Sequence, residues 1–525
     1  MKSLIIAAAL LGSATSAYAF CGFYVAPGDQ PMFDDATEVV LMRSGTRTVL
    51  SMQNNYKGPP SAFALVIPVP VVLHEGDVKT LPKAVFDRVD TMGAPRLVEY
   101  WEQDPCAPQM GYGVGGGRGA MHALARDRAA EPAAPFGVTV EAKFVVGEYQ
   151  IVILSAKDST GLESWLHHEQ YNIPDGAEPL LRPYVEAGSK FFVAKVDPAK
   201  VAFENGRAAL SPLRFHYDSD TFELPIRLGM ANSSGTQDLI VNILAPNQRY
   251  EVANYPNATI PTNLDVKASV REHFGAFYAA LFDATVEKHP GAVITEYSWQ
   301  ASSCDPCPGP TLGYADFQLL GADVIGPQPA PPPRRGRYLG GGGDFVLTRL
   351  HARYGKDLKD DLVFRAAAPI VGGREYVVDA QTGGLEDGAQ PSSNNTFQGR
   401  YAIRHPWTGA IACASPRRHL WGGPPNGVRP PPIAGTNLAF APRGEIKLAS
   451  VVDRDISELG VVATTPVSSS PSVVPTTAPA PEPVTYTPTK SQGCEAGNGS
   501  GWLVGLGVVG MAIRSRRRRA RQINQ

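Results

Sequence analysis

Cys304 and Cys307 have the C-x-x-C spacing that is typical of thiol–disulfide redox sites. A redox site needs a thiol of lowered pKa, which usually comes from the N-terminus of a following helix. The residues that follow here, Pro308-Gly309-Pro310, oppose a helix. We therefore favour a structural disulfide, formed within the pair or with Cys106 or Cys413, and keep a redox pair as the alternative. Zinc needs four ligands, which one C-x-x-C does not supply.

Histidine and carboxylate residues alternate in His216-Tyr217-Asp218-Ser219-Asp220. On a strand, His216, Asp218 and Asp220 would share one face, where calcium or a transition metal could bind. We favour a polar strand end or turn there and keep the metal site as the alternative. A second pattern, His168-Glu169, begins like the HExxH zinc motif, but position 172 is asparagine and the motif fails. The sequence therefore predicts no resident metal ion and no cofactor.

Aromatic and basic residues flank Cys413 on both sides, as His405-Pro406-Trp407 and as Arg418-His419-Leu420-Trp421. An exposed aromatic–basic surface could bind glycans or a partner, but we favour a disulfide-stapled, partly buried loop. The sequence has no G-x-S-x-G elbow, no Walker A loop and no dinucleotide-binding fingerprint. An enzyme hypothesis therefore has no named catalytic residues.

The elements that must position these residues are mostly strands. Residues 38–55 hold two β-branched runs separated by Ser44-Gly45, which predicts a hairpin, and residues 139–155 repeat the pattern around Gly147-Glu148. Residues 62–70 read as a buried strand that ends at prolines. The runs between 210 and 253 suggest an antiparallel meander. We predict a β-dominated α+β body with antiparallel sheets and meanders.

Three segments have helical patterns. They are residues 79–92, residues 158–171, with Asp158, Ser159 or Thr160 as the N-cap, and residues 270–289, where aromatic residues recur at helical spacing. Two Gly- and Pro-rich stretches near 108–135 and 326–343 are expected to be disordered inserts. Residues 20–460 would form the body, and residues 461–492, rich in Pro, Ser and Thr, a stalk.

The N-terminus has the pattern of a secretory signal peptide. Lys2 precedes an apolar run at residues 4–11, and Ala17-Tyr18-Ala19 supplies an A-x-A cleavage site. Cleavage after Ala19 would remove residues 1–19 and begin the mature chain at Phe20-Cys21. The chain is therefore expected outside the cytoplasm, where disulfides form.

The C-terminus, residues 493–525, places a single cysteine, Cys494, before a short apolar run and an arginine cluster. The run at residues 502–513 would span roughly 18 Å as a helix, against about 30 Å of bilayer hydrocarbon. It is marginal as a permanent anchor but adequate as a transient or weak single-pass segment. The six arginines from Arg514 to Arg521 would stay on the cytoplasmic side and leave the body outside.

The composition of the chain limits the partners it can bind and the disulfides it can form. The chain has 525 residues, and without Lys2, Glu495 and the six tail arginines, 41 basic and 49 acidic residues remain, a net charge of −8. Such a surface argues against nucleic acid or an anionic membrane as a partner. If Cys494 serves the tail, the disulfide candidates are Cys21, Cys106, Cys304, Cys307 and Cys413, which allow two disulfides and one free thiol. Their connectivity stays open.

Two resemblances follow from these segments. The order of Cys494, residues 502–513 and the run Arg516–Arg519 resembles the MYXO-CTERM sorting tail of myxobacterial surface proteins. That resemblance implies that a membrane-embedded sorting protease cuts near the cysteine. It also implies that the protein is retained at the cell surface, with lipid on that cysteine as one means of retention. Blocks such as FCGFYV, VVLMRSGTRTVLSMQNNYKGPPSAFALVIPVPVVL and SPLRFHYDSDTFELPIRLGMANSSGTQDLIVNILAPNQRYEVANYPN resemble the bacterial family catalogued as domain of unknown function 2330. This resemblance covers most of residues 20–450 and implies a secreted, often tethered protein with no assigned activity.

Our leading hypothesis is a surface-tethered, non-enzymatic binding or structural protein of the cell envelope. The alternatives are a secreted hydrolase with an unrecognised active site and an envelope thiol oxidoreductase that uses Cys304 and Cys307. The expected partners are the export machinery, a sorting protease for the tail, the envelope or outer-membrane surface, and an unknown extracellular ligand.

Overall fold

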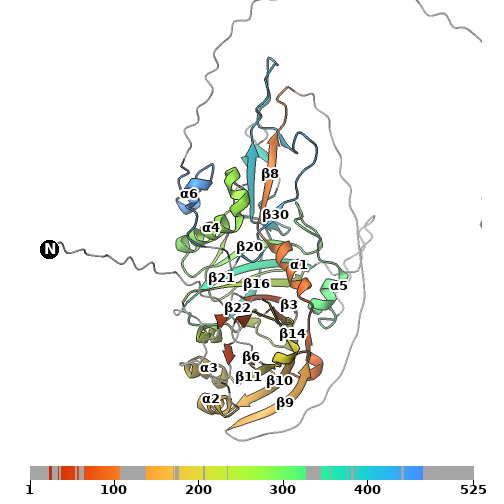
Figure 1. The fold of residues 1–525 in the computed structure, drawn as a ribbon, viewed down its shortest axis with the longest axis vertical. Coiled ribbons are helices and arrows are strands. Elements are labelled where there is room, and N and C mark those ends of the chain that lie inside the picture. Colours follow the sequence, from red (N-terminus) through yellow and green to blue (C-terminus); the bar gives the residue numbers. More distant parts are fainter. Residues whose placement is uncertain are drawn as a thin grey trace, which may run out of the picture. The chain divides into compact units, whose positions relative to one another are not determined.

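The structure is a computed structural model, and Figure 1 draws its ribbon. It describes residues 23–25, 33–34, 37–53, 56–57, 64–106, 137–169, 171, 177–204, 207–232, 235–326, 345–355, 358–374, 377–379, 384–386, 388–438, 441 and 443–464. All of these belong to one compact unit, residues 1–466. Ala19, Cys21, Cys494, the sorting tail, nearly all of the stalk and nearly all of both expected inserts lie outside the described residues.

A mixed sheet of eleven strands forms the centre of this unit. Its long strands are buried on both faces and largely apolar, because both faces are covered. In β3, for example, Val39 and Leu41 pack on one side and Val40 and Met42 on the other, and all four are buried. Along the sheet the order is β26 (Gln390–Pro391), β23 (Ile370–Gly372), β27 (Thr396–Gln398), β20 (Val293–Gln300), β21 (Phe345–Tyr354), β16 (Gln237–Pro246), β3 (Thr37–Ser44), β4 (Arg47–Gln53), β14 (Leu213–Asp218) and β7 (Val78–Thr80), with β18 (Asn257–Thr259) paired to β20.

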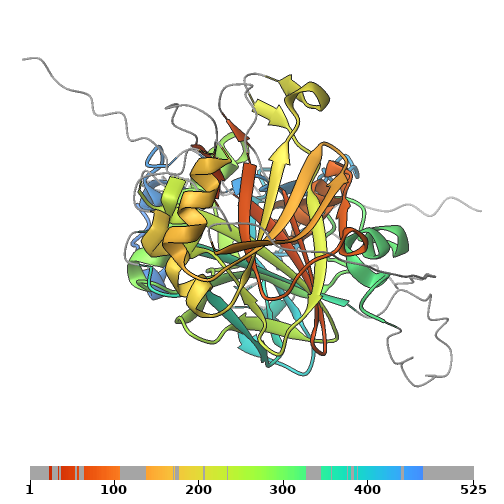
Figure 2. The same cartoon turned by 90° about the horizontal axis from the view of Figure 1, so that it is seen from below.

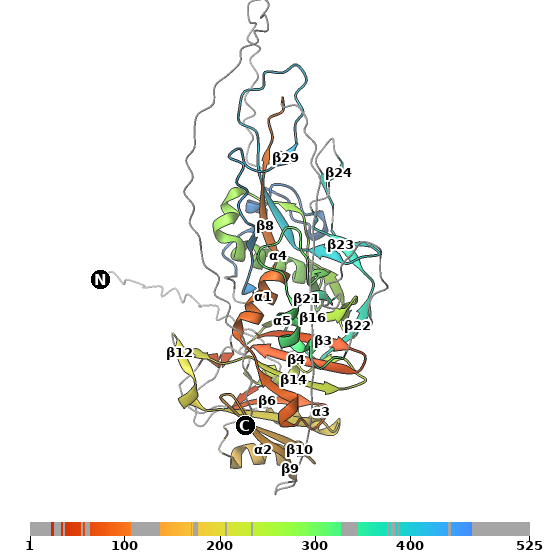
Figure 3. The same ribbon diagram turned by 90° about the vertical axis from the view of Figure 1, so that its right-hand side faces the viewer.

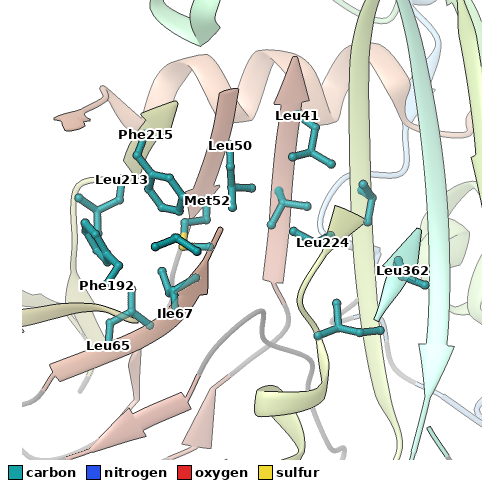
Figure 4. Packing of buried hydrophobic residues seen from close by; sticks show 14 of the residues in the cluster. Leu41, Leu50, Met52, Leu65, Ile67, Phe192, Leu213, Phe215, Leu224 and Leu362 are labelled. Atoms are coloured by element: carbon teal, nitrogen blue, oxygen red, sulfur yellow. The ribbon is translucent and has the colours of Figure 1, made fainter. Parts of the chain in front are cut away.

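A five-stranded antiparallel sheet packs on one face of the central sheet. Its order is β1 (Phe23–Val25), β6 (Ala64–Val69), β11 (Lys190–Val196), β10 (Tyr149–Ala156) and β9 (Val138–Val146). The main core lies between the two sheets, and Figure 4 shows Phe192 and Ile67 from one sheet facing Phe215 and Leu50 from the other. The outer face of the five-stranded sheet is covered by α2 (Ser159–His168) and α3 (Ala177–Glu186), seen in Figure 2.

The opposite face of the central sheet is covered by helices. The helix α1 (Lys83–Gly93) and the short α5 (Tyr314–Phe317) pack over β3, β4 and β20. The longest helix, α4 (Phe274–Lys288), packs nearby against β20 and β28. None of the helices in the described ranges is both long and apolar enough to cross a membrane.

A third sheet joins residues that are distant in the sequence. Its order is β19 (Leu264–Asp265), β28 (Arg400–His405), β8 (Arg96–Glu102) and β29 (Trp421–Gly422), with β30 (Ile433–Ala434) also paired to β8. The strands β8 and β28 run parallel, and Figure 3 shows β8 and β29 in its upper part. The remaining short elements are β12 (Ala202–Glu204), β13 (Arg207–Ala209), β5 (Tyr56–Lys57), β2 (Phe33–Asp34), β15 (Glu223–Leu224), β22 (Leu362–Ala367), β17 (Arg249–Val252), β24 (Val377–Asp379), β25 (Gly384–Leu385) and α6 (Leu448–Val451).

The predicted β-dominated α+β class is confirmed, as are several of its elements. The two predicted hairpins are β3–β4 and β9–β10, and each turn contains a glycine of positive φ, Gly45 and Gly147. The strand expected at 62–70 is β6, with every residue buried. Asp158 caps α2 by accepting a hydrogen bond from the Gly161 amide at 2.6 Å.

Two expectations need correction. The expected meander between 210 and 253 does not form, because β14 pairs with β4 and β7, while β16 pairs with β3 and β21. Part of that range is not a strand at all, since Arg227–Asn232 is a 3₁₀ helix. The helix expected at 79–92 begins only at Lys83, because Val78–Thr80 pairs with β14 and Pro82 is extended at the N-cap.

Candidate functional site

Three basic residues alternate on one face of β21, beneath α1 and α4. Arg349, His351 and Arg353 point to the same side because side chains on a strand alternate. Arg349 is completely buried, and its Nη1 atom donates to Asp90 on α1 at 2.7 Å. Such a charge is tolerated in the interior only when it is paired. The carboxylate partners of the three basic residues come from β16, β20, α1 and α4. We call the whole set the buried network: Asp90, Asp238, Tyr278, Asp283, Glu296, Arg349, His351 and Arg353.

Glu296 is the centre of the buried network. The β20–β21 register shifts between Thr295 and Tyr297, so Glu296 is the extra residue of a β-bulge, a feature that re-aims a side chain. Its carboxylate accepts hydrogen bonds from Arg349 Nε at 2.8 Å, His351 Nδ1 at 2.7 Å and the Tyr278 hydroxyl at 2.5 Å. Burial alone would raise its pKa, but His351, Arg349 and Tyr278 lower it to about 2.

His351 lies between two carboxylates and an aromatic ring. Its Nε2 atom is 3.4 Å from Asp238 Oδ1, and its ring stacks on Phe282 with centroids 3.7 Å apart. Burial lowers the pKa of His351, but Glu296 and Asp238 outweigh burial and leave the pKa raised. Only 3% of the side chain is exposed, so this histidine cannot meet a substrate from solution. The buried network therefore joins α1 and α4 to the central sheet.

A different group of charged and aromatic side chains lies on the third sheet, where Tyr100 is buried and the others are partly or fully exposed. In the β8–β28 register Arg404 is opposite Tyr100, and in the β29–β8 register Trp421 is opposite Glu102, so these side chains share one face. The Arg404 guanidinium lies 4.8 Å from the Trp421 ring centroid, and that of Arg429 lies 5.6 Å from the Tyr100 centroid. We call this surface the arginine face: Tyr100, Arg404, Arg418, Trp421 and Arg429.

The buried carboxylate of Glu102 organises the arginine face. It accepts hydrogen bonds from Arg418 Nε and Nη2, at 2.7 and 2.9 Å, and from the amides of Trp407 and His419, at 2.9 and 2.8 Å. The bond from Arg418 is the main reason that its pKa is lowered to about 2, and the two amides add to the effect. The carboxylate of Glu102 therefore joins β8 to both ends of the loop between β28 and β29.

The opposite face of the same strands carries a histidine. His405 Nε2 lies 2.8 Å from Glu99 Oε2, and the ring stacks on Trp101 with centroids 4.6 Å apart. Arg271 also pairs with Glu99. Burial, and then Arg271, lower the pKa of His405, so the imidazole is neutral at neutral pH. A neutral imidazole bound to a carboxylate can accept a proton, but no described serine or cysteine is hydrogen-bonded to His405 as a nucleophile.

Four of the candidate cysteines form two disulfides. Cys106 pairs with Cys413, which fixes the loop after β28 to the end of β8, and Cys304 pairs with Cys307. The local pairing therefore applies to the C-x-x-C segment. Its backbone is held from both sides, because Arg96 Nη1 donates to the Pro306 carbonyl at 2.9 Å and Gln398 Nε2 to the Asp305 carbonyl at 2.6 Å. The segment is followed by irregular chain up to α5, so no helix N-terminus faces the thiols.

The histidine and the two carboxylates of the pattern at β14 do not come together at one site. His216 contacts the Asp77 carbonyl at 3.2 Å, whereas Asp218 is bound by Arg47 through two bonds of 2.8 Å. Asp220 lies beyond the end of β14, and its carbonyl accepts from Arg43. Throughout the part of the chain that the structure describes, no three His, Cys, Asp or Glu side chains are placed to hold a metal ion. His168 lies exposed at the end of α2.

Sequence reasoning missed most of this site. It identified Arg418 and Trp421 near Cys413, but not Tyr100, Glu102 or Arg404, whose importance depends on the pairing of β8 with β28. The buried network had one visible signal. The alternation Arg349-Leu-His351-Ala-Arg353 places three basic residues on one face of an otherwise apolar strand, and such residues need buried partners.

These features define a β-dominated α+β protein with an ionic network under its helices and an arginine-rich face on its third sheet. The chain belongs to the family described as uncharacterized protein conserved in bacteria (DUF2330), whose model matches residues 15–365. The match is shorter than the resemblance over residues 20–450, and it ends within β22. It contains the whole buried network, whereas β28 and the loop that carries Arg418 and Trp421 lie beyond it. No curated protein and no solved structure matches the chain.

Proposed function

We propose that the chain is a surface-tethered binding protein of the cell envelope that has no catalytic activity, and that the arginine face holds its ligand. This proposal rests on a difference in solvent exposure between two sets of side chains. The side chains best suited to acid–base chemistry, Glu296 and His351, are enclosed in ion pairs, whereas Arg404, Arg418 and Trp421 are partly open to solvent. A binding surface needs accessible aromatic and arginine side chains, and these residue types dominate binding energies at interfaces.

The tethering half of the proposal rests on the sequence. Ala17-Tyr18-Ala19 is a cleavage site for export, residues 461–492 have the composition of an extended stalk, and Cys494 precedes the short apolar run and the arginines. A stalk between anchor and body would leave the body free to meet ligands. The two disulfides fit an oxidising compartment.

The hydrolase and thiol oxidoreductase alternatives have weaker support. A hydrolase needs a nucleophile and a base that a substrate can reach, and the acid–base pair of Glu296 and His351 is buried. An oxidoreductase of the C-x-x-C type uses a helix to lower the pKa of a thiol, and residues 308–313 after Cys307 are not helical.

A photocrosslinking experiment on intact cells tests the proposal. A photoreactive amino acid replaces Val428, which is 72% exposed beside Arg429, or, as the matched control, Val145, which is 54% exposed on β9. We expect adducts to extracellular material from position 428 and few from position 145. Equal labelling at both positions, or none at 428, would overturn the assignment of the binding surface.

A further inference from the structure

We propose that the ligand of the arginine face is an acidic polysaccharide, a saccharide chain that carries carboxylate or sulfate groups. This inference rests on the proposed function and adds the chemical class of the ligand. It depends on three features: a local excess of positive charge, guanidinium groups that are held in place, and ring faces that are already covered.

The loop between β28 and β30 is locally basic. Residues 406–432 contain Arg417, Arg418 and Arg429 but no aspartate or glutamate, whereas the whole chain has 48 basic and 50 acidic residues. All three arginines are exposed. Arg418 pairs with Glu102 and Arg404 with Asp265, so the arginines around this face outnumber the carboxylates that contact them in the described residues. On a body with a net charge of −8, such a surface attracts an anionic ligand more strongly than the remaining surface does.

The guanidinium groups are oriented before any ligand arrives. Arg404 lies over the Trp421 ring while its Nε atom donates to Asp265 at 2.6 Å, and Arg418 uses Nε and Nη2 on Glu102. Within the described residues, neither the two Nη atoms of Arg404 nor Nη1 of Arg418 has a hydrogen-bond partner. These donors can meet carboxylate or sulfate oxygens, and groups that are already ordered lose less entropy on binding.

The aromatic rings favour a saccharide over a nucleic acid. Sequence-independent binding of single strands relies on bases that stack on open aromatic faces. Here Arg404 covers Trp421, and Arg429 and Arg400 lie over Tyr100, so the rings position guanidinium groups. Among the described residues of this loop, Ile411 and Val428 are the exposed large hydrophobic side chains, which is too little apolar surface for insertion into a membrane.

The test measures the affinity of the full chain for three dextrans that share one backbone: unmodified dextran, carboxymethyl dextran and dextran sulfate. We expect binding of both charged forms, no binding of unmodified dextran, and weaker binding as salt rises, because exposed charges are screened. The double variant Arg404→Gln/Arg429→Gln should weaken binding by about tenfold or more, since each charge-assisted contact is worth about that factor.

The matched control is Arg182→Gln/Arg365→Gln, which removes the same charge from two exposed ion pairs elsewhere, with Glu178 and Glu251. It should change the affinity by less than about twofold. Arg429→Gln alone repeats the test without disturbing the Arg404–Asp265 pair, in case the double variant folds poorly.

Each other outcome has a definite meaning. Equal binding of charged and unmodified dextran, with crosslinking at position 428 intact, would overturn the acidic ligand and leave the binding function standing. If single-stranded DNA or phosphatidylserine vesicles bound as tightly as carboxymethyl dextran, and lost affinity equally in the double variant, the saccharide assignment would fail. Absence of all binding together with absence of crosslinking would reject both proposals.

Discussion

At the scale of single residues, Glu296 should be the most sensitive polar position of the body. It is fully buried, and Glu296→Gln removes the charge that faces Arg349 and His351 while keeping a similar shape. Breaking one side of a buried ion pair costs about 3–5 kcal/mol, because the remaining charge stays buried without compensation. We expect a loss of that size in the free energy of unfolding, measured by denaturant titration at an unchanged m-value.

The control for this prediction is a pair of the same chemistry on the surface. Lys83 and Asp87 on α1 form an ion pair in which 58% and 57% of the side chains are exposed. Asp87→Asn should cost no more than about 1 kcal/mol, because water screens an exposed pair. Similar losses from Glu296→Gln and Asp87→Asn would mean that the network does not stabilise the body.

His351 should give the body a pH dependence of a definite sign. Its pKa is raised in the folded chain, because Glu296 and Asp238 outweigh burial. A raised pKa stabilises the fold fully below the unfolded value of about 6.5, and the contribution is lost as pH rises through the folded pKa. The stability of the wild type relative to His351→Gln should therefore be greatest at acidic pH and should decline toward alkaline pH.

Denaturant titrations of both proteins between about pH 5 and pH 9 measure this difference. Taking the difference between two proteins removes the opposite contributions of His216 and His405, whose pKa values are lowered and which are present in both. A difference that stays constant over this range would contradict a raised pKa for His351.

At the scale of elements, the two disulfides should contribute very differently. The Cys106–Cys413 bond joins residues 307 positions apart, and Cys304–Cys307 joins residues 3 apart. The entropy of loop closure gives about 5 kcal/mol for a long loop and about 2 kcal/mol for the shortest. We expect Cys106→Ser/Cys413→Ser to lower the free energy of unfolding clearly more than Cys304→Ser/Cys307→Ser does.

Limited proteolysis locates the effect. Arg417 and Arg418 lie in the loop that Cys413 anchors, so trypsin should cut there faster once the Cys106–Cys413 bond is absent. Loss of the Cys304–Cys307 bond should leave cleavage at this loop unchanged, because Arg96 and Gln398 still hold the segment. The reverse order of sensitivity would show that the first disulfide does not organise the arginine face.

Elements with local causes could be predicted from the sequence. Gly45 and Gly147 mark turns of positive φ, and Asp158 marks a helix start, because each is decided by neighbouring residues. Strand partners could not be predicted, since both faces of β16 are buried and mostly apolar, and many neighbouring strands would suit it. The bulge at Glu296 was also hidden, because a one-residue shift in register leaves no mark on composition.

The contacts of the candidate site could not be predicted either, because they join residues that are far apart in the sequence. Glu99 and His405 are 306 positions apart, and Glu102 and Arg418 are 316 apart, yet each pair is in direct contact. The sequence indicated an aromatic and basic cluster around Cys413, which the structure contains. It could not indicate that buried carboxylates of β8 hold that cluster, because this depends on the parallel pairing of β8 with β28.

At the scale of the whole molecule, binding and attachment should be separable properties. The arginine face lies in the compact unit of residues 1–466, whereas Cys494 lies outside the described residues. If a sorting protease and the cysteine together retain the chain, Cys494→Ala should move it from the cell surface to the medium without changing the body. Surface biotinylation and immunoblots of cells and medium measure the two fractions.

Ser500→Ala, six positions further along the same tail, is the control and should leave the chain on the cell. The released Cys494→Ala protein should also keep the tryptic pattern of the wild type and its affinity for carboxymethyl dextran, because no residue of the arginine face is changed. An unaltered surface fraction would refute the role of Cys494 in attachment. Release with lost affinity would instead show that the ligand is bound jointly with the membrane-proximal tail, and the arginine face would no longer suffice as the binding surface.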